Sequence, residues 1–163
     1  MDAKDGDELL PQIYDQLKVM ARRYRGPRDS LMPTELVHEA YLRLSDDGPW
    51  QSPTHFRATA AVAMRRLLID RARRRDADKR GGGWDRITLS GLGAAPDIDV
   101  IALDESLSTL ERMDHRKAQI VQLRFFGGLT MPEIAAHLSV SLRTVEKDWR
   151  RARAWLSMQL NTG

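Results

Sequence analysis

A short amphipathic segment, a three-residue turn and a longer amphipathic segment occupy residues 129–156 and impose helical structure on the last third of the chain. Leu129–Leu138 and Leu142–Leu156 each carry apolar residues at helical spacing, and Ser139–Ser141 separates them. Two helices joined so tightly are held at a fixed angle. The pattern predicts a helix-turn-helix, whose second helix is shaped to enter the major groove of DNA.

The second helix of this pair has an apolar face and a basic face. The apolar face is expected to pack inward and consists of Val145, Trp149, Ala152 and Leu156. Between residues 141 and 153, five basic residues outnumber two acidic ones: Arg143, Lys147, Arg150, Arg151 and Arg153 against Glu146 and Asp148. Arginine binds guanine edges or phosphates, and Ser141 suits the helix N-cap. The alternative is a solvated charged face, and the two acids would repel phosphate unless one accepts a hydrogen bond from a cytosine amine.

Three apolar stripes before residue 80 predict three helices that close a small bundle over residues 7–80. The stripes are Ile13, Leu17, Met20 and Tyr24; Val37, Ala40, Tyr41 and Leu44; and Phe56, Ala60, Ala63 and Leu67. Pro33-Thr34 is a plausible start for the second helix.

The helical pattern stops at Gly81-Gly82-Gly83, which opens a stretch of five glycines and one proline. Residues 81–100 are therefore predicted to be a flexible linker. A long loop within one domain is the alternative, and such loops are uncommon. Two more apolar stripes follow, the second ending at Gly127-Gly128, so residues 101–160 are predicted to form a four-helix domain with the helix-turn-helix.

The third predicted helix of the first domain ends in a second basic patch. Between residues 65 and 80, eight basic residues stand against three acidic ones. Such a patch binds the nucleic-acid backbone with strong salt dependence, although a solvated helix end is the alternative. Asp70 has the spacing to pair with Arg66 and Arg73. Two basic patches on a tether can bind two stretches of DNA at once.

A polar loop before this helix contains Trp50, which could hold an unstacked base or simply cover the end of the bundle. The four histidines are scattered without a metal-binding pattern, and cysteine is absent. Asp70, Asp76 and Asp78 suit ion pairs with neighbouring arginines better than a metal. The sequence has no phosphate-binding loop of Walker type, nucleophile elbow or His-Glu-x-x-His motif. We expect no catalytic residues, no metal and no cofactor.

The N-terminus lacks a secretory apolar core, and no run approaches the length that spans a membrane. A soluble cytoplasmic protein without membrane contact is expected.

Three segments together resemble the extracytoplasmic function (ECF) group of bacterial RNA polymerase sigma factors. They are Leu36–Leu44, His55-Phe56 leading into Met64–Arg75, and Val121–Thr130 running into the helix-turn-helix. The resemblance implies two helical domains: a sigma-2-like bundle of three to four helices over 7–80 and a sigma-4-like domain over 101–160. In that family, sigma-2 binds the β′ clamp helices of core RNA polymerase and melts the minus-ten element. Sigma-4 binds the β flap and reads the minus-thirty-five element.

The resemblance also implies roles for individual residues. Glu35, Glu39 and Arg43 would lie on the polymerase-binding helix. The minus-ten strand would meet Trp50, Arg65, Arg66, Arg73, Arg74 and Arg75. Duplex DNA at the minus-thirty-five element would meet Ser141, Arg143, Thr144, Lys147, Arg150 and Arg151.

One position departs from the family pattern. Family members usually carry an acidic cluster where the polymerase-binding helix begins, and this chain has Thr34 there. A threonine at that point is an ordinary helix cap. The sharper hypothesis is that phosphorylation of Thr34 supplies the missing negative charge, as in the subgroup associated with Ser/Thr kinases rather than anti-sigma factors.

Two other classes of function remain as alternatives. The first is a stand-alone helix-turn-helix regulator that binds a palindromic operator as a dimer. The second is an enzyme acting on nucleic acid, which the missing catalytic motifs disfavour.

Overall fold

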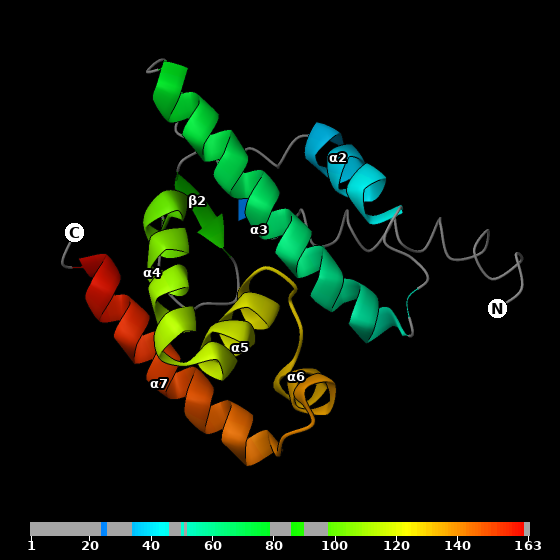
Figure 1. Ribbon diagram of the computed structural model, residues 1–163, viewed down its shortest axis with the longest axis vertical. Coiled ribbons are helices and arrows are strands. Elements are labelled where there is room, and N and C mark those ends of the chain that lie inside the picture. The colour runs from blue at the N-terminus through cyan, green and yellow to red at the C-terminus, as the bar shows by residue number, and fades with distance from the viewer. Residues whose placement is uncertain are drawn as a thin grey trace, which may run out of the picture.

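The computed structural model describes residues 24–25, 34–45, 50, 52–78, 86–89 and 98–161. Six helices account for most of this part of the chain, which confirms the predicted all-α class (Figure 1). They are α2 (Thr34–Ser45), α3 (Pro53–Asp78), α4 (Val100–Met113), α5 (His115–Phe125), α6 (Met131–Leu138) and α7 (Leu142–Asn161). The first predicted helical stripe falls outside the described residues except for Tyr24, and helix α2 begins at Thr34 as predicted.

Three short strands form a small antiparallel sheet in the order β1-β2-β3: β1 (Tyr24–Arg25), β2 (Arg86–Leu89) and β3 (Ile98–Asp99). Tyr24 pairs with Leu89, and Arg86 pairs with Asp99. Tyr24 therefore lies in a strand, and its prediction as part of a helix is wrong. Two segments of the predicted linker, Arg86–Leu89 and Ile98–Asp99, are strands of this sheet. The central strand, β2, pairs with β1 on one side and with β3 on the other.

Helix α3 is the longest element and lies between α2 on one side and α4, α5 and α6 on the other (Figure 1). Ser52 caps its start: the Ser52 hydroxyl accepts the His55 N–H at 3.1 Å, and Pro53 occupies the first turn, where its missing N–H costs nothing. Small alanines fill much of its buried surface. They let neighbouring helices approach α3 from both sides.

One buried apolar cluster joins the two regions that the sequence assigns to separate domains. It contains Phe56, Met64 and Leu67 of α3 together with Leu107 of α4 and Leu156 of α7. In a second cluster, Ala58 of α3 packs with residues of α5 and of the helix-turn-helix: Ile120, Leu123, Leu129, Ile134, Ala135 and Val145. The N-terminal helices (α2 and α3) and the C-terminal helices (α4–α7) therefore share their cores, and their independent folding stays a prediction.

The turn between α5 and α6 is shaped by two glycines. Gly128 adopts a φ of 67°, and the Leu129 N–H reaches back to the Leu123 carbonyl at 3.2 Å, which ends α5 in the way expected of a glycine stop. A Cβ on Gly127 would lie 3.2 Å from the Cβ of Ala61 and 2.7 Å from the Leu123 carbonyl oxygen. Gly127 thus permits α3 to pack closely against this turn.

The predicted helix-turn-helix is present as α6, a turn and α7. The Thr130 hydroxyl accepts the Glu133 N–H at 3.2 Å, and the Glu133 carboxylate accepts the Thr130 N–H at 3.0 Å, which completes a capping box. At the other end of α6, Ser139 takes a left-handed conformation with a φ of 56° and turns the chain into α7. These local hydrogen bonds fix both ends of the first helix.

Candidate nucleic-acid interface

The first turn of α7 is held by Ser141, as predicted. Its hydroxyl accepts the Thr144 N–H at 3.1 Å, and its carbonyl accepts the Val145 N–H at 3.1 Å. The Ser141 and Thr144 hydroxyls also lie 2.9 Å apart. Both predicted DNA-facing hydroxyls are thus fixed at the N-terminus of α7, where backbone N–H groups favour an anion.

Helix α7 separates an apolar face from a basic face along its length. Val145, Ala152 and Leu156 are buried, and Trp149 is half-buried. The basic side chains on the other face are exposed: Arg143, Lys147, Arg150, Arg151 and Arg153. None of these five forms a salt bridge with another residue in the described part of the chain. The face is therefore open to phosphates and base edges.

Asp148 does not belong to this basic face, so the repulsion of phosphate that the sequence led us to expect from it does not apply. Its side chain is buried, and the carboxylate accepts a hydrogen bond from Arg116 Nε at 2.6 Å, with Lys117 Nζ 4.0 Å away. The hydrogen bond to Asp148 raises the pKa of Arg116. Asp148 ties α7 to the first turn of α5, so Glu146 is the one acid exposed between residues 141 and 153.

The predicted minus-ten arginines lie along α3 in three different situations. Arg66, Arg73 and Arg74 are exposed. The Arg75 side chain falls outside the described residues. Arg65 points toward the C-terminal helices, where its Nε donates to Asp104 Oδ1 at 2.7 Å.

Arg65 is bound by α4 and α5 through several hydrogen bonds. Its Nη1 donates to Gln122 Oε1 at 3.0 Å, and its Nη2 lies 3.3 Å from both the Asp104 carbonyl and the Ser108 hydroxyl. Only 14% of the side chain is exposed. The prediction that Arg65 faces DNA therefore does not hold for this arrangement of the helices.

A second arginine of α3, Arg57, makes an equivalent contact that sequence reasoning missed. Its Nη1 donates to Glu133 Oε2 at 2.6 Å, and its Nη2 donates to the Gly128 carbonyl at 2.7 Å. Glu133 is also the capping-box acid of α6. Burial pushes the pKa of Glu133 up, but the hydrogen bonds from Thr130 and the charge of Arg57 outweigh burial and leave this pKa below its ordinary value. The capping box is readable in the sequence, whereas the partner 76 residues away is not.

We call the set of these contacts the α3 interface: Arg57 with Glu133 and Gly128, and Arg65 with Asp104, Ser108 and Gln122. The ion pairs are partly exposed, so each contributes on the order of 1 kcal/mol. The apolar clusters beneath them add to the association. Two carboxylates of the C-terminal helices thus occupy two guanidinium groups of α3, in the way that phosphates would.

Asp70 and Trp50 also differ from what the sequence favours. The Asp70 carboxylate lies 3.8 Å from Arg43 Nη2 and not in a salt bridge with Arg66 or Arg73. Trp50 is half-buried, with its ring edge-on to Phe56 at a centroid distance of 5.0 Å. This geometry agrees with the packing alternative, and the DNA contact of Trp50 stays a prediction.

The predicted polymerase-binding residues share helix α2. Glu39 is half-buried and Arg43 is exposed, beside the exposed apolar side chain of Leu42. The backbones of Thr34 and Glu35 form the first turn of α2, while their side chains lie outside the described residues. Periodicity puts Glu35, Glu39 and Arg43 along one face of the helix.

Other kinds of site were sought in the same residues. The described part of the chain holds no cluster of three or more potential metal ligands. Among its helices, none combines the length and apolar character needed to cross a bilayer.

Comparison with known proteins gives one consistent family. The sequence model described as ECF sigma factor matches residues 1–162. The ECF RNA polymerase sigma factor SigK of Mycobacterium tuberculosis is 26% identical over 156 residues, covering 86% of this chain and 80% of the relative. SigK of Mycobacterium ulcerans is 25% identical over 165 residues, covering 92% of this chain and 84% of the relative. No solved structure matches the chain.

The α3 interface predicts a specific pH dependence of stability. Glu133→Gln is expected to lower the free energy of unfolding by roughly 1 kcal/mol at pH 7, because Arg57 loses a charged acceptor. Since the folded-state pKa of Glu133 lies below the ordinary value of 4.5, its charge stabilises the fold above that pH, and the contribution is lost as the pH falls through the folded-state pKa. Thermal or urea unfolding from pH 7 to pH 3 measures the difference between the two proteins.

The matched control is Glu105→Gln on α4, where the carboxylate is exposed. It should match the wild type across this pH range. A Glu133→Gln difference that stays constant down to pH 3 would contradict a role for the Glu133 charge.

Proposed function

The chain belongs to the ECF sigma factor family, and we propose which of its helices contacts which promoter element. As a member of this family, it is a sigma factor that directs transcription initiation by core RNA polymerase. In this proposal, α7 reads the minus-thirty-five element and α3 meets the minus-ten element. The observation that carries it is the exposed basic face of α7, which forms no salt bridge with any described residue and lies opposite a buried apolar face. A helix of this kind, following a tight turn, fits the major groove.

On α7, the proposed DNA contacts divide into two kinds. Arg143 and Lys147 lie in the first two turns of α7, the end that enters the groove, and the guanidinium and ammonium groups match guanine acceptors there. Arg150 and Arg151 lie further along the helix, where phosphate contact is the simpler role. Ser141 and Thr144 add phosphate contacts at the helix start.

On α3, Arg66, Arg73 and Arg74 are exposed and suited to the backbone of the minus-ten strand. Arg65 serves the same purpose only after its contacts with Asp104 and Gln122 break. Arg57 would then be freed from Glu133 as well. Promoter melting by α3 therefore requires the C-terminal helices to leave the α3 interface, and binding to core polymerase is the step that separates them.

Contacts with the polymerase are proposed at both ends of the molecule. Helix α2 would bind the β′ clamp helices through Glu35, Glu39 and Arg43, with the exposed Leu42 beside them. The C-terminal helices would bind the β flap. The polymerase supplies the chemistry of transcription, and no catalytic residue is assigned to this chain. The alternative of a dimeric operator-binding regulator is not favoured, because the family match covers residues 1–162 and not the helix-turn-helix alone.

Thr34 is proposed as a point of control. It is the first residue of α2, and a phosphate at a helix N-terminus is stabilised by the helix dipole. The negative charge of this phosphate would lie where members of the family carry acidic residues, and it would help α2 bind basic residues of the polymerase. A Ser/Thr kinase would be the regulator in this case, and an anti-sigma factor is the alternative.

Transcription in vitro with core polymerase tests the assignment of α7. We expect Arg150→Ala and Lys147→Ala each to weaken promoter complexes about tenfold. Arg150→Ala, which removes a proposed phosphate contact, should also reduce the slope of log affinity against log salt by about one. Arg112→Ala is the matched control, because Arg112 is an exposed arginine of α4 and not of α7. A palindromic footprint formed without polymerase would favour the dimeric regulator instead.

The switch at Thr34 is tested by comparing core-polymerase binding of the wild type, Thr34→Glu and Thr34→Ala. Thr34→Glu is expected to bind several-fold more tightly than the other two, because it adds negative charge at the start of α2. Circular dichroism of the three proteins controls for loss of helix. Equal affinities for all three would rule the switch out.

A further inference from the structure

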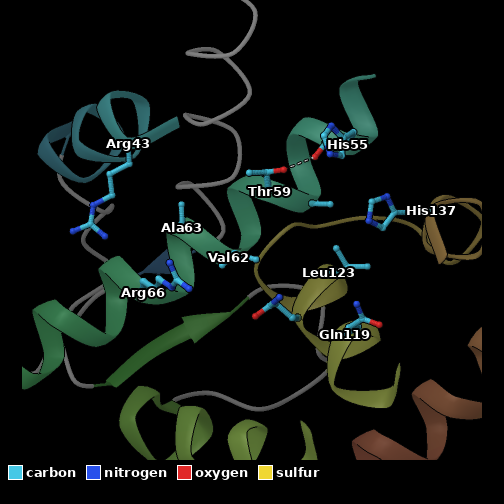
Figure 2. Close-up of a pocket in the computed structure, with 11 residues that line it drawn as sticks. Arg43, His55, Thr59, Val62, Ala63, Arg66, Gln119, Leu123 and His137 are labelled. Carbon is cyan, nitrogen blue, oxygen red and sulfur yellow. Dashed lines mark hydrogen bonds between the residues drawn. The ribbon is translucent and has the colours of Figure 1, made fainter. Parts of the chain in front are cut away.

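A cavity of about 380 Å³ lies where α2 and α3 meet α5 and α6, beside the α3 interface (Figure 2). Its walls come from both the N-terminal and the C-terminal helices, so it exists only while the two are packed together. The volume is within the range of pockets that bind small molecules.

The polar side chains that line the cavity carry positive charge or neutral hydrogen-bonding groups. Arg43, His55 and Arg66 come from the N-terminal helices, and Gln119, Gln122 and His137 come from the C-terminal helices. Among the residues that the structure describes, no carboxylate lines it. In Figure 2, Arg66 and Gln119 approach the cavity from opposite sides, and His55 and His137 stand at one end, with ring centroids 6.5 Å apart.

Unlike Arg57 and Arg65, Arg66 forms no salt bridge within the part of the chain that the structure describes, although Asp70, Asp104 and Glu111 line an adjoining hollow that Arg66 also borders. Arg57 and Arg65 are each bound to a carboxylate at 2.6 Å and 2.7 Å. Arg66 makes no salt bridge or side-chain hydrogen bond with any residue that the structure describes. A guanidinium beside a cavity without acids is a site for an anion.

The glutamines complete the set of donors. The Gln122 side-chain oxygen accepts from Arg65 Nη1 at 3.0 Å, which leaves its amide N–H groups for the cavity. Gln119 makes no described side-chain hydrogen bond and lies one helical turn before Leu123, another lining residue. The α5 side of the cavity therefore offers amide donors opposite the Arg66 guanidinium.

We propose that this cavity binds a phosphate group that joins α3 to α5 and α6. Arg66 would bind the phosphate through charge-assisted hydrogen bonds, and Gln119, Gln122 and His137 would donate from the other side. A small phosphorylated molecule fits the volume, and apolar side chains such as Val62 and Leu123 would contact its body.

Phosphate binding in the cavity would reduce the ability of α3 to bind promoter DNA. A ligand that needs side chains from both sets of helices binds the packed arrangement and not the separated one, so it shifts the population toward the packed form. Under the proposed function, on which this consequence rests, Arg65 and Arg66 are then withheld from the promoter. The ligand would act as an inhibitor of initiation.

Proton NMR of the histidine ring Cε1–H groups tests the site directly, because the chain has four histidines. Inorganic pyrophosphate is the probe, titrated into the full-length protein at constant ionic strength. His55 and His137 line the cavity and should show saturable shifts, whereas His38 and His115 are exposed elsewhere and serve as internal controls. Equal or non-saturating shifts of all four resonances would overturn the proposal.

Two variants and a control make the test residue-specific. Arg66→Gln removes the guanidinium charge and Gln119→Glu introduces a carboxylate opposite it, so each should weaken pyrophosphate binding about tenfold or more. Arg112→Gln on α4 removes one exposed arginine outside the cavity and should bind like the wild type. Unchanged affinity in Arg66→Gln would overturn the assignment.

A second titration tests whether the bound phosphate comes from a small phosphorylated molecule or from the backbone of DNA. A tetranucleotide of single-stranded DNA is added in place of pyrophosphate. Binding of pyrophosphate with His55 and His137 shifts supports the proposal, whereas shifts with the tetranucleotide alone mean that the cavity belongs to the DNA interface and overturn it. Neither titration contains polymerase or promoter, so its failure leaves the sigma-factor function intact. Loss of promoter-specific transcription would likewise leave a measured pyrophosphate site in place.

Discussion

Arg57 and Arg65 hold the C-terminal helices against α3, and the accessibility of the other proposed surfaces depends on that contact. Each guanidinium is bound to a carboxylate, Glu133 or Asp104, at less than 3 Å. Apolar side chains of α3, α4 and α7 pack beneath them. The exposed basic face of α7 remains available in this arrangement, whereas Arg65 does not. The two proposed DNA-binding helices are therefore unequal: α7 presents all of its proposed basic contacts, whereas α3 keeps Arg65 bound to Asp104.

The helix-turn-helix could be predicted in detail because its determinants are local. Ser141 lies three residues before the N–H that it accepts, and Thr130 and Glu133 cap each other across one turn. The same reasoning misplaced Asp148, because nothing near it in sequence reveals that Arg116 lies 32 residues away in the chain but 2.6 Å away in space. A charge on a helix can be assigned to a face only when its distant partners are known.

Contacts with residues distant in sequence also decide which faces of helix α3 are buried. Its apolar stripe predicted one buried face, but the helix packs against α2 on one side and against α4, α5 and α6 on the other (Figure 1). A basic residue such as Arg65 therefore looks like a DNA contact in the sequence and is an internal hydrogen-bond donor in the fold. Arg57 was missed because its partners, Glu133 and Gly128, lie more than 70 residues away. Contacts across the predicted linker could not be foreseen from helical periodicity.

The most direct test of the account measures the distance between α3 and α7 in the free protein and in complex with core polymerase. The chain has no cysteine, so Arg73→Cys with Ser157→Cys gives two unique positions for spin labels, and Arg112→Cys with Ser157→Cys is a control within the C-terminal helices. The account predicts one narrow distance distribution between positions 73 and 157 in the free protein and a longer distance in the complex, with the control unchanged. An identical distance between positions 73 and 157 in both states would contradict it.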